Sequence, residues 1–375
     1  MRTMSKNKTT NSVPALKVKQ WLAEWDDIAW SEEDRGAEPQ HWFYQFSMKA
    51  SDLKALSGIY PRTTQRRKRG ADDLGIQRRH EVKRSEEIKK FVKYGYPWSE
   101  LSENKRNSGD FKDLRQPGWL PTAIVINILT ANDERLGKKV AQGELVTIED
   151  GTDADATVKL PDGFNGPKWR HSAKDIPPVE VIDGQHRLWA FEDDDLSGDF
   201  ELPVVAFVGL DLRWQAYLFY TLNIKPKKIN ASLAFDLYPL LRTQEWLTKF
   251  EGHVIYRQAR AQELVDLLWS HEESPWHHRI NMLGEPSHNG RMVTQAAWVR
   301  SLLASLVKSW EGRGVRIGGL FGSSVGRHET VLPWSRTEQA AFLIVAGQAV
   351  KDAIRAVKEP WAEALRDQET PTLFQ

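Results

Sequence analysis

Apolar patterns in the first 230 residues predict the strands of a β-sheet. Large apolar side chains recur at every second position from Trp42 to Met48, which is the period of a β-strand. Three further segments, 121–129, 178–182 and 202–208, are short, nearly continuous apolar runs, typical of strands buried on both faces. These runs alternate with helical patterns, so the chain is expected to belong to the α/β class.

Residues 131–177 are rich in glycine and turn formers. They predict an inserted hairpin whose strands are Glu144–Ile148 and Thr157–Leu160. Apolar residues at helical spacing predict helices over 14–30, 51–56, 84–94 and 213–222. Ser51 is the expected N-cap of the second of these helices.

Beyond residue 230 the apolar residues keep helical spacing and strand patterns are scarce. Apolar residues at roughly helical spacing in 233–241, 264–268, 297–306 and 337–357 predict a mostly helical part. The expected organisation is therefore an N-terminal tail and helix (1–40), an α/β domain (41–230) and a helical C-terminal domain (231–375).

One junction between a strand and a helix carries candidate chemistry. The run 178–182 leads into Asp183-Gly184-Gln185-His186-Arg187, and the apolar residues that follow, to Phe191, predict the first turn of a helix. A glycine turn ahead of a helix start attracts anions, phosphate above all. His186 and Arg187 add positive charge that fits a triphosphate.

Composition narrows the class of protein. The chain has 375 residues, of which 40% are hydrophobic and 27% charged, as in globular proteins. No apolar run approaches the ~20 residues that span a bilayer, and residues 1–13 lack the apolar core of a secretory signal. The absence of cysteine excludes disulfides, thiolate nucleophiles and cysteine-ligated metals. A cytoplasmic protein without membrane contact is expected.

Charge is concentrated in one segment although the chain as a whole carries a net charge of only +1. Residues 61–94 contain twelve basic and five acidic residues, a local net charge of +7. The segment is interpreted either as a phosphate-contacting surface for DNA, with Arg66, Arg67, Lys68 and Arg69 in a loop, or as a solvated basic loop.

Two other places with basic residues, the segment 223–228 and Arg78, each have a functional and a purely structural interpretation. Asn223 and Lys225 lie ahead of Lys227 and Lys228 in a proline-containing turn, which would contact nucleotide or DNA phosphates or be an exposed loop. Arg78 would close a nucleotide pocket from the opposite wall or form a surface salt bridge.

The pentapeptide Asp183–Arg187, behind an apolar strand and ahead of Leu188-Trp189-Ala190-Phe191, resembles the DGQHR-domain family of the ParB/sulfiredoxin-like group. The lysine-rich segment after Asn223 and the Gln-Arg at 77–78 resemble that family more loosely. The resemblance implies a ParB/sulfiredoxin-like α/β fold whose loop holds nucleotide phosphates. Gln185 occupies the position of the catalytic cysteine of sulfiredoxin, so reductase activity is excluded.

Within the family, the chain looks most like the DpdB-type component of systems that insert 7-deazaguanine into DNA, and next like DndB-type regulators of phosphorothioation. The first likeness implies a bacterial or phage protein that binds and hydrolyses ATP or another NTP with Mg²⁺, loads or opens double-stranded DNA and assists a partner transglycosylase. The second implies DNA binding without essential turnover. A ParB-like nuclease is a third alternative, and the oligomeric state is left open, a homo-oligomer included.

The expected roles at the loop follow the chemistry of phosphoryl transfer. Gly184 to Arg187 would cradle the phosphates, with His186 and Arg187 on the β- and γ-oxygens. Asp183 or Glu180 would bind Mg²⁺, since hard cations prefer carboxylates. Gln185 would position the attacking water.

Overall fold

The structure, a computed structural model, divides into two compact units, Met1–Pro226 and Lys227–Gln375. The described residues are 11–30, 38–58, 81–96, 98–109, 112, 115–135, 137–172, 174–191, 200–223, 231–236, 254–284, 293–307, 311–312, 315–316, 321 and 334–366. The division falls four residues before the expected one at 230.

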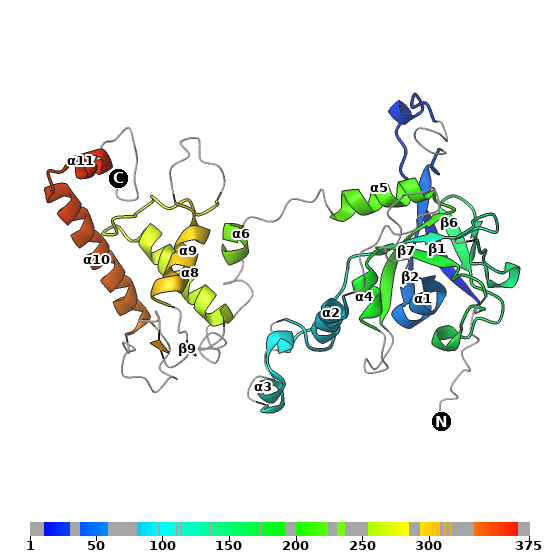
Figure 1. Ribbon diagram of the computed structural model, residues 1–375, viewed down its shortest axis with the longest axis horizontal. Coiled ribbons are helices and arrows are strands. Elements are labelled where there is room, and N and C mark those ends of the chain that lie inside the picture. The colour runs from blue at the N-terminus through cyan, green and yellow to red at the C-terminus, as the bar shows by residue number, and fades with distance from the viewer. Residues whose placement is uncertain are drawn as a thin grey trace. The chain divides into compact units, whose positions relative to one another are not determined.

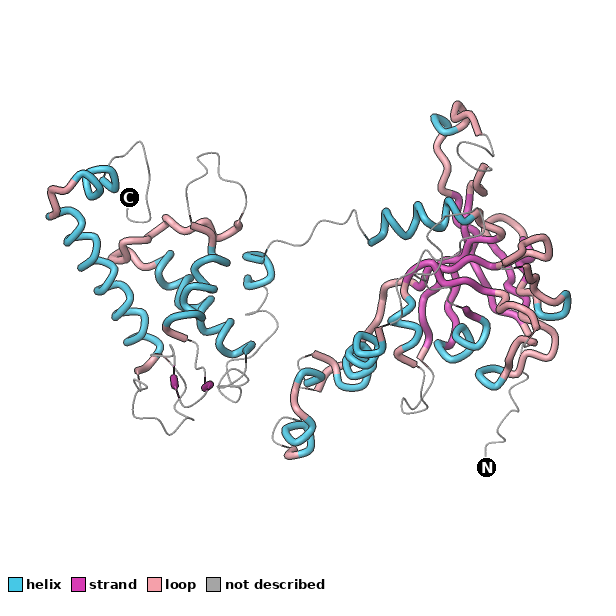
Figure 2. Tube along the Cα trace, in the orientation of Figure 1, coloured by secondary structure: helices cyan, strands magenta, loops and turns pink. Residues whose placement is uncertain are grey.

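The first unit is built on a mixed eight-stranded sheet (Figures 1 and 2). Its order is β3-β7-β4-β8-β2-β1-β6-β5. The strands are β1 (Ser12–Lys19), β2 (Trp42–Lys49), β3 (Ser57–Gly58), β4 (Ile124–Ile128), β5 (Thr147–Asp150), β6 (Asp155–Lys159), β7 (Val179–Asp183) and β8 (Glu201–Val208). The pairs β3–β7 and β4–β8 are parallel and the other pairs are antiparallel, so the expected α/β class is confirmed.

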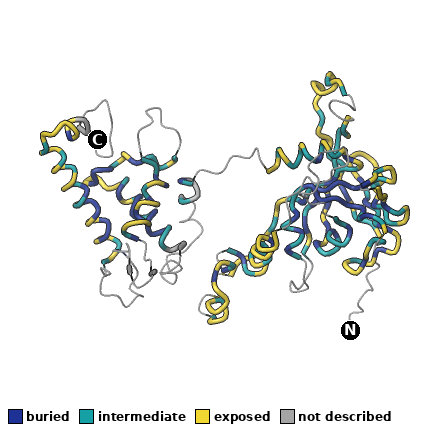
Figure 3. The backbone as a smooth tube through the Cα atoms, viewed as in Figure 1, coloured by how far each residue is buried: buried dark blue, intermediate teal, exposed yellow. Residues whose placement is uncertain are grey.

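Buried side chains on the central strands form the main core (Figure 3). In β2 the predicted alternation is confirmed, because Tyr44, Phe46 and Met48 are buried and the residues between them are exposed. β4 and β7, which arise from two of the apolar runs, are buried almost throughout, whereas in β8 the buried residues Leu202, Val204 and Ala206 alternate with partly buried ones. In β4 and β7, continuous apolar character thus reflects strands that are covered on both faces.

Helices of the first unit pack beside this sheet or extend from it. They are α1 (Ala50–Leu56), α2 (Val82–Tyr94), α3 (Glu103–Asn107), α4 (Gln185–Trp189) and α5 (Leu212–Asn223), with short 3-10 turns at Ala23–Trp25, Trp98–Glu100, Gln142–Glu144 and Gly166–Lys168. α1 and α4 lie side by side against the sheet, where Leu53, Leu56 and Leu188 join its core (Figure 1). The helices predicted over 84–94 and 213–222 are confirmed as α2 and α5. Ser51 is not the cap of α1, because Lys49 holds the N-cap position and no side chain caps it.

The predicted helix over 14–30 is wrong. Residues 12–19 form β1, which lies between β2 and β6 and pairs with both. The helical spacing of Trp21 and Trp25 reflects an aromatic cluster instead, in which the Trp21 ring stacks on His41 with centroids 3.7 Å apart. Pairing with two strands distant in sequence outweighs the local 3.6-residue period, which is only a weak preference.

The predicted hairpin is confirmed as β5 and β6, with its strands shifted by a few residues. Its turn passes through Asp153, whose φ is +58°. The shift moves Glu144 into a 3-10 turn, where its carboxylate accepts a hydrogen bond from the Ser172 backbone N–H at 2.9 Å.

The described part of the second unit contains α6 (Ala231–Asp236), α8 (Val254–Ser270), α9 (Gln295–Ser305), α10 (Arg336–Ala356), α11 (Pro360–Arg366) and the short strands β9 (Glu311–Gly312) and β10 (Val315–Arg316). Its core joins α8, α9 and α10 through buried side chains such as Leu264, Leu268 and Val299. A capping box of Ser335 and Glu338 begins α10. Among the described residues, no helix has the length and apolar character to cross a membrane.

Candidate functional site

The turn between β7 and α4 depends on Gly184. Its φ of +92° and ψ of 12° lie in the left-handed region that other residues rarely adopt. A Cβ atom there would lie 2.7 Å from Ile124 Cδ1 and 3.1 Å from Arg187 Nη2. The Gly184 carbonyl accepts the first helical hydrogen bonds from Arg187 and Leu188, and Leu188 is fully buried. The predicted order of strand, glycine turn and helix is therefore confirmed.

Arg187 joins three segments at this turn. Its Nη2 lies 2.9 Å from Asp183 Oδ2, and its Nη1 donates to both the carbonyl and the hydroxyl oxygen of Thr122. The Asn223 amide, at the end of α5, donates to Asp183 Oδ1 at 3.1 Å. The structure thus brings together Asp183, Arg187 and Asn223, three of the predicted site residues, and adds Thr122, which the sequence did not single out.

The strand register is irregular beside this cluster. β4 and β7 pair regularly from Ile126 to Ile128, but the register shifts between Val125 and Ile126, opposite Asp183. Such irregularities redirect side chains at the end of a ladder and are frequent near functional sites. Here the shift lies two residues after Ala123, at the point where the chain passes from Thr122 into β4.

One basic group of α2, Arg84, interacts electrostatically with Arg187 at this turn. Burial lowers the pKa of Arg187, the Asp183 carboxylate opposes that shift, and the charge of Arg84 adds to it, so the two guanidinium groups are electrostatic neighbours. The Ser85 hydroxyl donates to the His186 carbonyl at 3.1 Å and fixes α2 against α4. Arginine remains charged at any physiological pH, so both groups add positive potential near the turn.

Donor capacity remains on Arg187 after these contacts. A guanidinium carries five N–H bonds, and the contacts to Thr122 and Asp183 engage three of them. Nε–H and the second hydrogen of Nη2 have no partner among the described residues. Because the side chain is mostly buried, an anion that accepted these bonds would be only weakly screened by solvent.

Gln185 and His186 lie at the start of α4. Gln185 is buried, and its Nε2 lies 3.4 Å from His186 Nε2. The predicted roles of Gln185 in positioning water and of His186 in holding phosphate concern a bound ligand and stay predictions.

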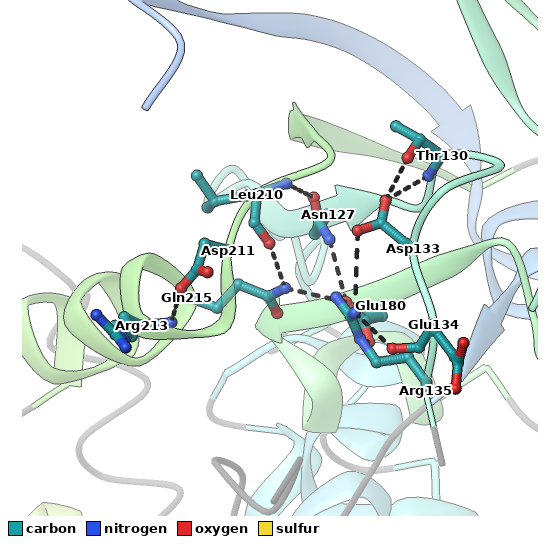
Figure 4. Close-up of polar contacts among 10 residues, drawn as sticks. All are labelled: Asn127, Thr130, Asp133, Glu134, Arg135, Glu180, Leu210, Asp211, Arg213 and Gln215. Atoms are coloured by element: carbon teal, nitrogen blue, oxygen red, sulfur yellow. Dashed lines mark hydrogen bonds and ion pairs between the residues drawn. The ribbon is translucent and has the colours of Figure 1, made fainter. Parts of the chain in front are cut away.

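Glu180 lies in a separate buried network, away from the turn (Figure 4). Arg135 binds it in a bidentate manner, with Nε 2.8 Å from Oε1 and Nη2 3.1 Å from Oε2. Asn127 and Gln215 also donate to Oε2, at 3.1 and 3.0 Å. Glu180 and Asp183 are three positions apart in a strand and point to opposite faces of the sheet. The structure does not bring the two predicted metal ligands together.

This network holds the start of α5. The Gln215 amide, which donates to Glu180, also donates to the Leu210 carbonyl at 3.0 Å. Asn127 Oδ1 accepts a hydrogen bond from the Leu210 N–H at 2.8 Å (Figure 4). Sequence reasoning missed Arg135, Asn127 and Gln215. Part of this network was recognisable in the sequence, because Asn127 and Glu180 are isolated polar residues inside apolar strands.

The described residues do not form a dedicated magnesium site. They contain no group of three or more His, Cys, Asp or Glu side chains that could hold a metal. At the turn, the carboxylate of Asp183 already accepts from Arg187 and Asn223. Mg²⁺ fits here only as an ion carried mainly by phosphates and water, which is a usual mode for this cation.

Several predicted residues lie outside the described part of the chain. They are the basic-loop residues Arg66, Arg67, Lys68 and Arg69, the pocket residue Arg78, and the lysines Lys225, Lys227 and Lys228. Their nucleotide and DNA contacts stay predictions.

The chain was compared with known proteins by family, by sequence and by structure. No family model, curated protein or solved structure matches it. The likeness to the DGQHR family therefore stays a prediction carried by the pentapeptide and by the geometry of its turn.

Proposed function

We propose that the chain binds ATP or another nucleoside triphosphate at the turn Asp183–Arg187. The observation that carries the proposal is the guanidinium of Arg187. It is mostly buried, it lies near a second arginine, Arg84, and it retains two N–H donors beyond its contacts with described residues. Arginine donors held in a fixed orientation bind phosphate oxygens strongly.

We further propose that the first unit has a ParB/sulfiredoxin-like fold. The mixed sheet and the glycine turn between β7 and α4 support this assignment, and the DGQHR sequence at that turn is its specific feature. The lack of cysteine removes sulfinate reduction from the activities of such a fold. A nucleotide-binding role at the turn is compatible with the remaining residues.

The proposed setting is a DNA-modification system, in which the chain acts on double-stranded DNA beside a transglycosylase-like partner that inserts 7-deazaguanine. α2 supports a DNA contact. It exposes Lys83, Arg84, Lys90 and Lys93 and is joined to the turn through Ser85. A change of nucleotide at the turn would thereby reach a basic helix directly.

A DndB-like regulator without turnover is the second candidate. Asp183 favours it, because both of its oxygens already accept hydrogen bonds, as in a group that orients Arg187. ATP hydrolysis would instead need Asp183 to share its oxygens with Mg²⁺-bound water. Measured turnover separates the two candidates.

The decisive experiment measures binding and turnover in matched variants. Calorimetric titration with Mg-ATP should show binding by the wild type and a loss of about tenfold or more in Arg187→Gln, because charged hydrogen bonds contribute about 1.5–3 kcal/mol. Arg170→Gln removes an exposed arginine of the same unit and should bind like the wild type. If Arg187→Gln bound Mg-ATP as tightly as Arg170→Gln and the wild type do, this turn would not be the nucleotide site.

Turnover is tested with variants that remain folded by circular dichroism. If the chain hydrolyses ATP at this turn, Asp183→Ala and Arg187→Ala should both abolish most of the activity. Activity at the wild-type rate in both would place hydrolysis elsewhere. Binding without any turnover in the wild type would support the regulator.

A further inference from the structure

Trp119 is held in an exposed position beside the candidate nucleotide site. Its side chain is 75% exposed, the largest fraction among the large hydrophobic residues in the described ranges. Single exposed hydrophobic residues are common on protein surfaces, so exposure alone carries no argument. Two further observations support a role for Trp119: the close packing of the backbone around it and its position three residues before Thr122.

Close backbone packing fixes the segment that carries this ring. A Cβ atom on Gly118 would lie 1.9 Å from the carbonyl oxygen of Phe91, so only glycine lets the chain approach α2 this closely. Gly95 packs equally tightly, since its Cβ would lie 2.0 Å from the Gln116 carbonyl oxygen. On the other side, Leu120 packs against the main core. The backbone that carries the exposed indole is therefore anchored before and after Trp119 without a ligand.

Trp119 is also close to the phosphate end of the site. Thr122, which accepts two hydrogen bonds from Arg187, lies three residues further along. Three residues span at most about 11 Å even when fully extended. That distance is comparable with the length of a nucleoside triphosphate, so a nucleotide whose phosphates lie at Arg187 can place its base at the indole.

We propose that Trp119 stacks on the base of the nucleotide whose phosphates bind at Arg187. This inference rests on the proposed function and adds to it, because it makes the ligand a nucleoside phosphate rather than a simple polyphosphate. Stacking on an aromatic ring tolerates any base, since every base has a π face. The site therefore requires a base and discriminates little between adenine and guanine at this contact.

The test compares ATP with inorganic tripolyphosphate by calorimetric titration of the full-length protein. Trp119→Ala should weaken ATP binding by about 5- to 150-fold, the usual effect of losing one base stack. It should leave the affinity for tripolyphosphate unchanged, and Trp119→Phe should restore most of the affinity for ATP. Trp361→Ala, which removes an exposed tryptophan of the second unit, is the matched control.

The outcomes separate this inference from the function on which it rests. If the wild type binds neither ATP nor tripolyphosphate, the phosphate site itself fails. If tripolyphosphate binds but Trp119→Ala leaves ATP affinity intact, the stacking role is overturned and the phosphate site stands. Equal losses for both ligands would also overturn it, because they would show a structural effect on the turn.

Discussion

Replacing Glu180 with Gln tests whether the buried polar network holds the first unit together. The substitution keeps the shape of the side chain but removes its charge. It also replaces one carboxylate oxygen by an NH₂ group, which cannot accept a hydrogen bond from Arg135, Asn127 or Gln215.

The expected loss follows from the burial of the pair. Glu180 and Arg135 are 4% and 8% exposed, so the variant leaves a guanidinium charge away from water. The carboxylate oxygen Oδ1 of Asp133 lies 3.9 Å from Nη1 of Arg135 and compensates only in part. Breaking a buried pair costs about 3–5 kcal/mol, and a value near 3 kcal/mol is expected here because the amide keeps one acceptor. That is a large share of the about 5–15 kcal/mol that stabilises a typical protein.

Urea unfolding measured by far-UV circular dichroism provides the assay, with one transition fitted for each unit. For an m-value of about 1–3 kcal/mol/M, the midpoint of the first unit should fall by about 1 M or more. Glu149→Gln is the matched control. It breaks an exposed pair with Lys159, and such pairs contribute only about 0–1 kcal/mol.

Two results would refute the reasoning. One is a midpoint for Glu180→Gln that equals that of Glu149→Gln. The other concerns the apolar double variant Glu180→Met with Arg135→Met, which leaves no lone buried charge and should be more stable than Glu180→Met alone. A double variant that is less stable than the single one would show that charge imbalance is not the cause.

Three further predictions concern the turn and the sheet. Gly184→Ala should destabilise the first unit by about 1–3 kcal/mol and abolish ATP binding. Gly137 also has a positive φ, but a Cβ atom there would meet no atom within 4 Å. Gly137→Ala should therefore lower the thermal unfolding temperature less and leave ATP binding intact. Asn223→Asp sets a second carboxylate against Asp183 and should weaken ATP binding more than Asn223→Ala does; the reverse order in calorimetry would contradict the contact. The hydrogen bond from Lys17 holds the pKa of Asp150 below its ordinary value, so this carboxylate stabilises the fold above that value and loses its contribution as the pH falls. Asp150→Asn should therefore reduce the difference between urea midpoints at about pH 7 and about pH 3, and an unchanged difference would contradict this assignment.

The local elements were predictable where one residue pattern dominated. β4, β7 and β8 were identified because continuous apolar runs are rare outside buried strands, and the turn at Gly184 because glycine follows such a run. β1 was mistaken for a helix because its pairing with β2 and β6 depends on residues far along the chain. Periodicity within one segment contains no information about such partners.

The candidate site was predictable only in part for the same reason. Asp183 and Arg187 are four residues apart, so their contact follows from the local turn. Thr122 and Asn223 reach it from other segments, and no spacing in the sequence relates them to Arg187. Glu180 was assigned to metal binding from its closeness in sequence to Asp183, but the alternation of side chains in a strand directs it to Arg135 instead.

The internal place of β1 in the sheet, between β2 and β6, bears on how the chain folds during synthesis. Ser12 pairs with Lys159, and the β5–β6 hairpin joins the sheet only through β1. During synthesis, β1 must wait for well over a hundred further residues before its second neighbour, β6, emerges from the ribosome. Such distant pairing is slow and leaves strand edges exposed, so efficient production should depend on chaperones that shield β1 until β6 has been made.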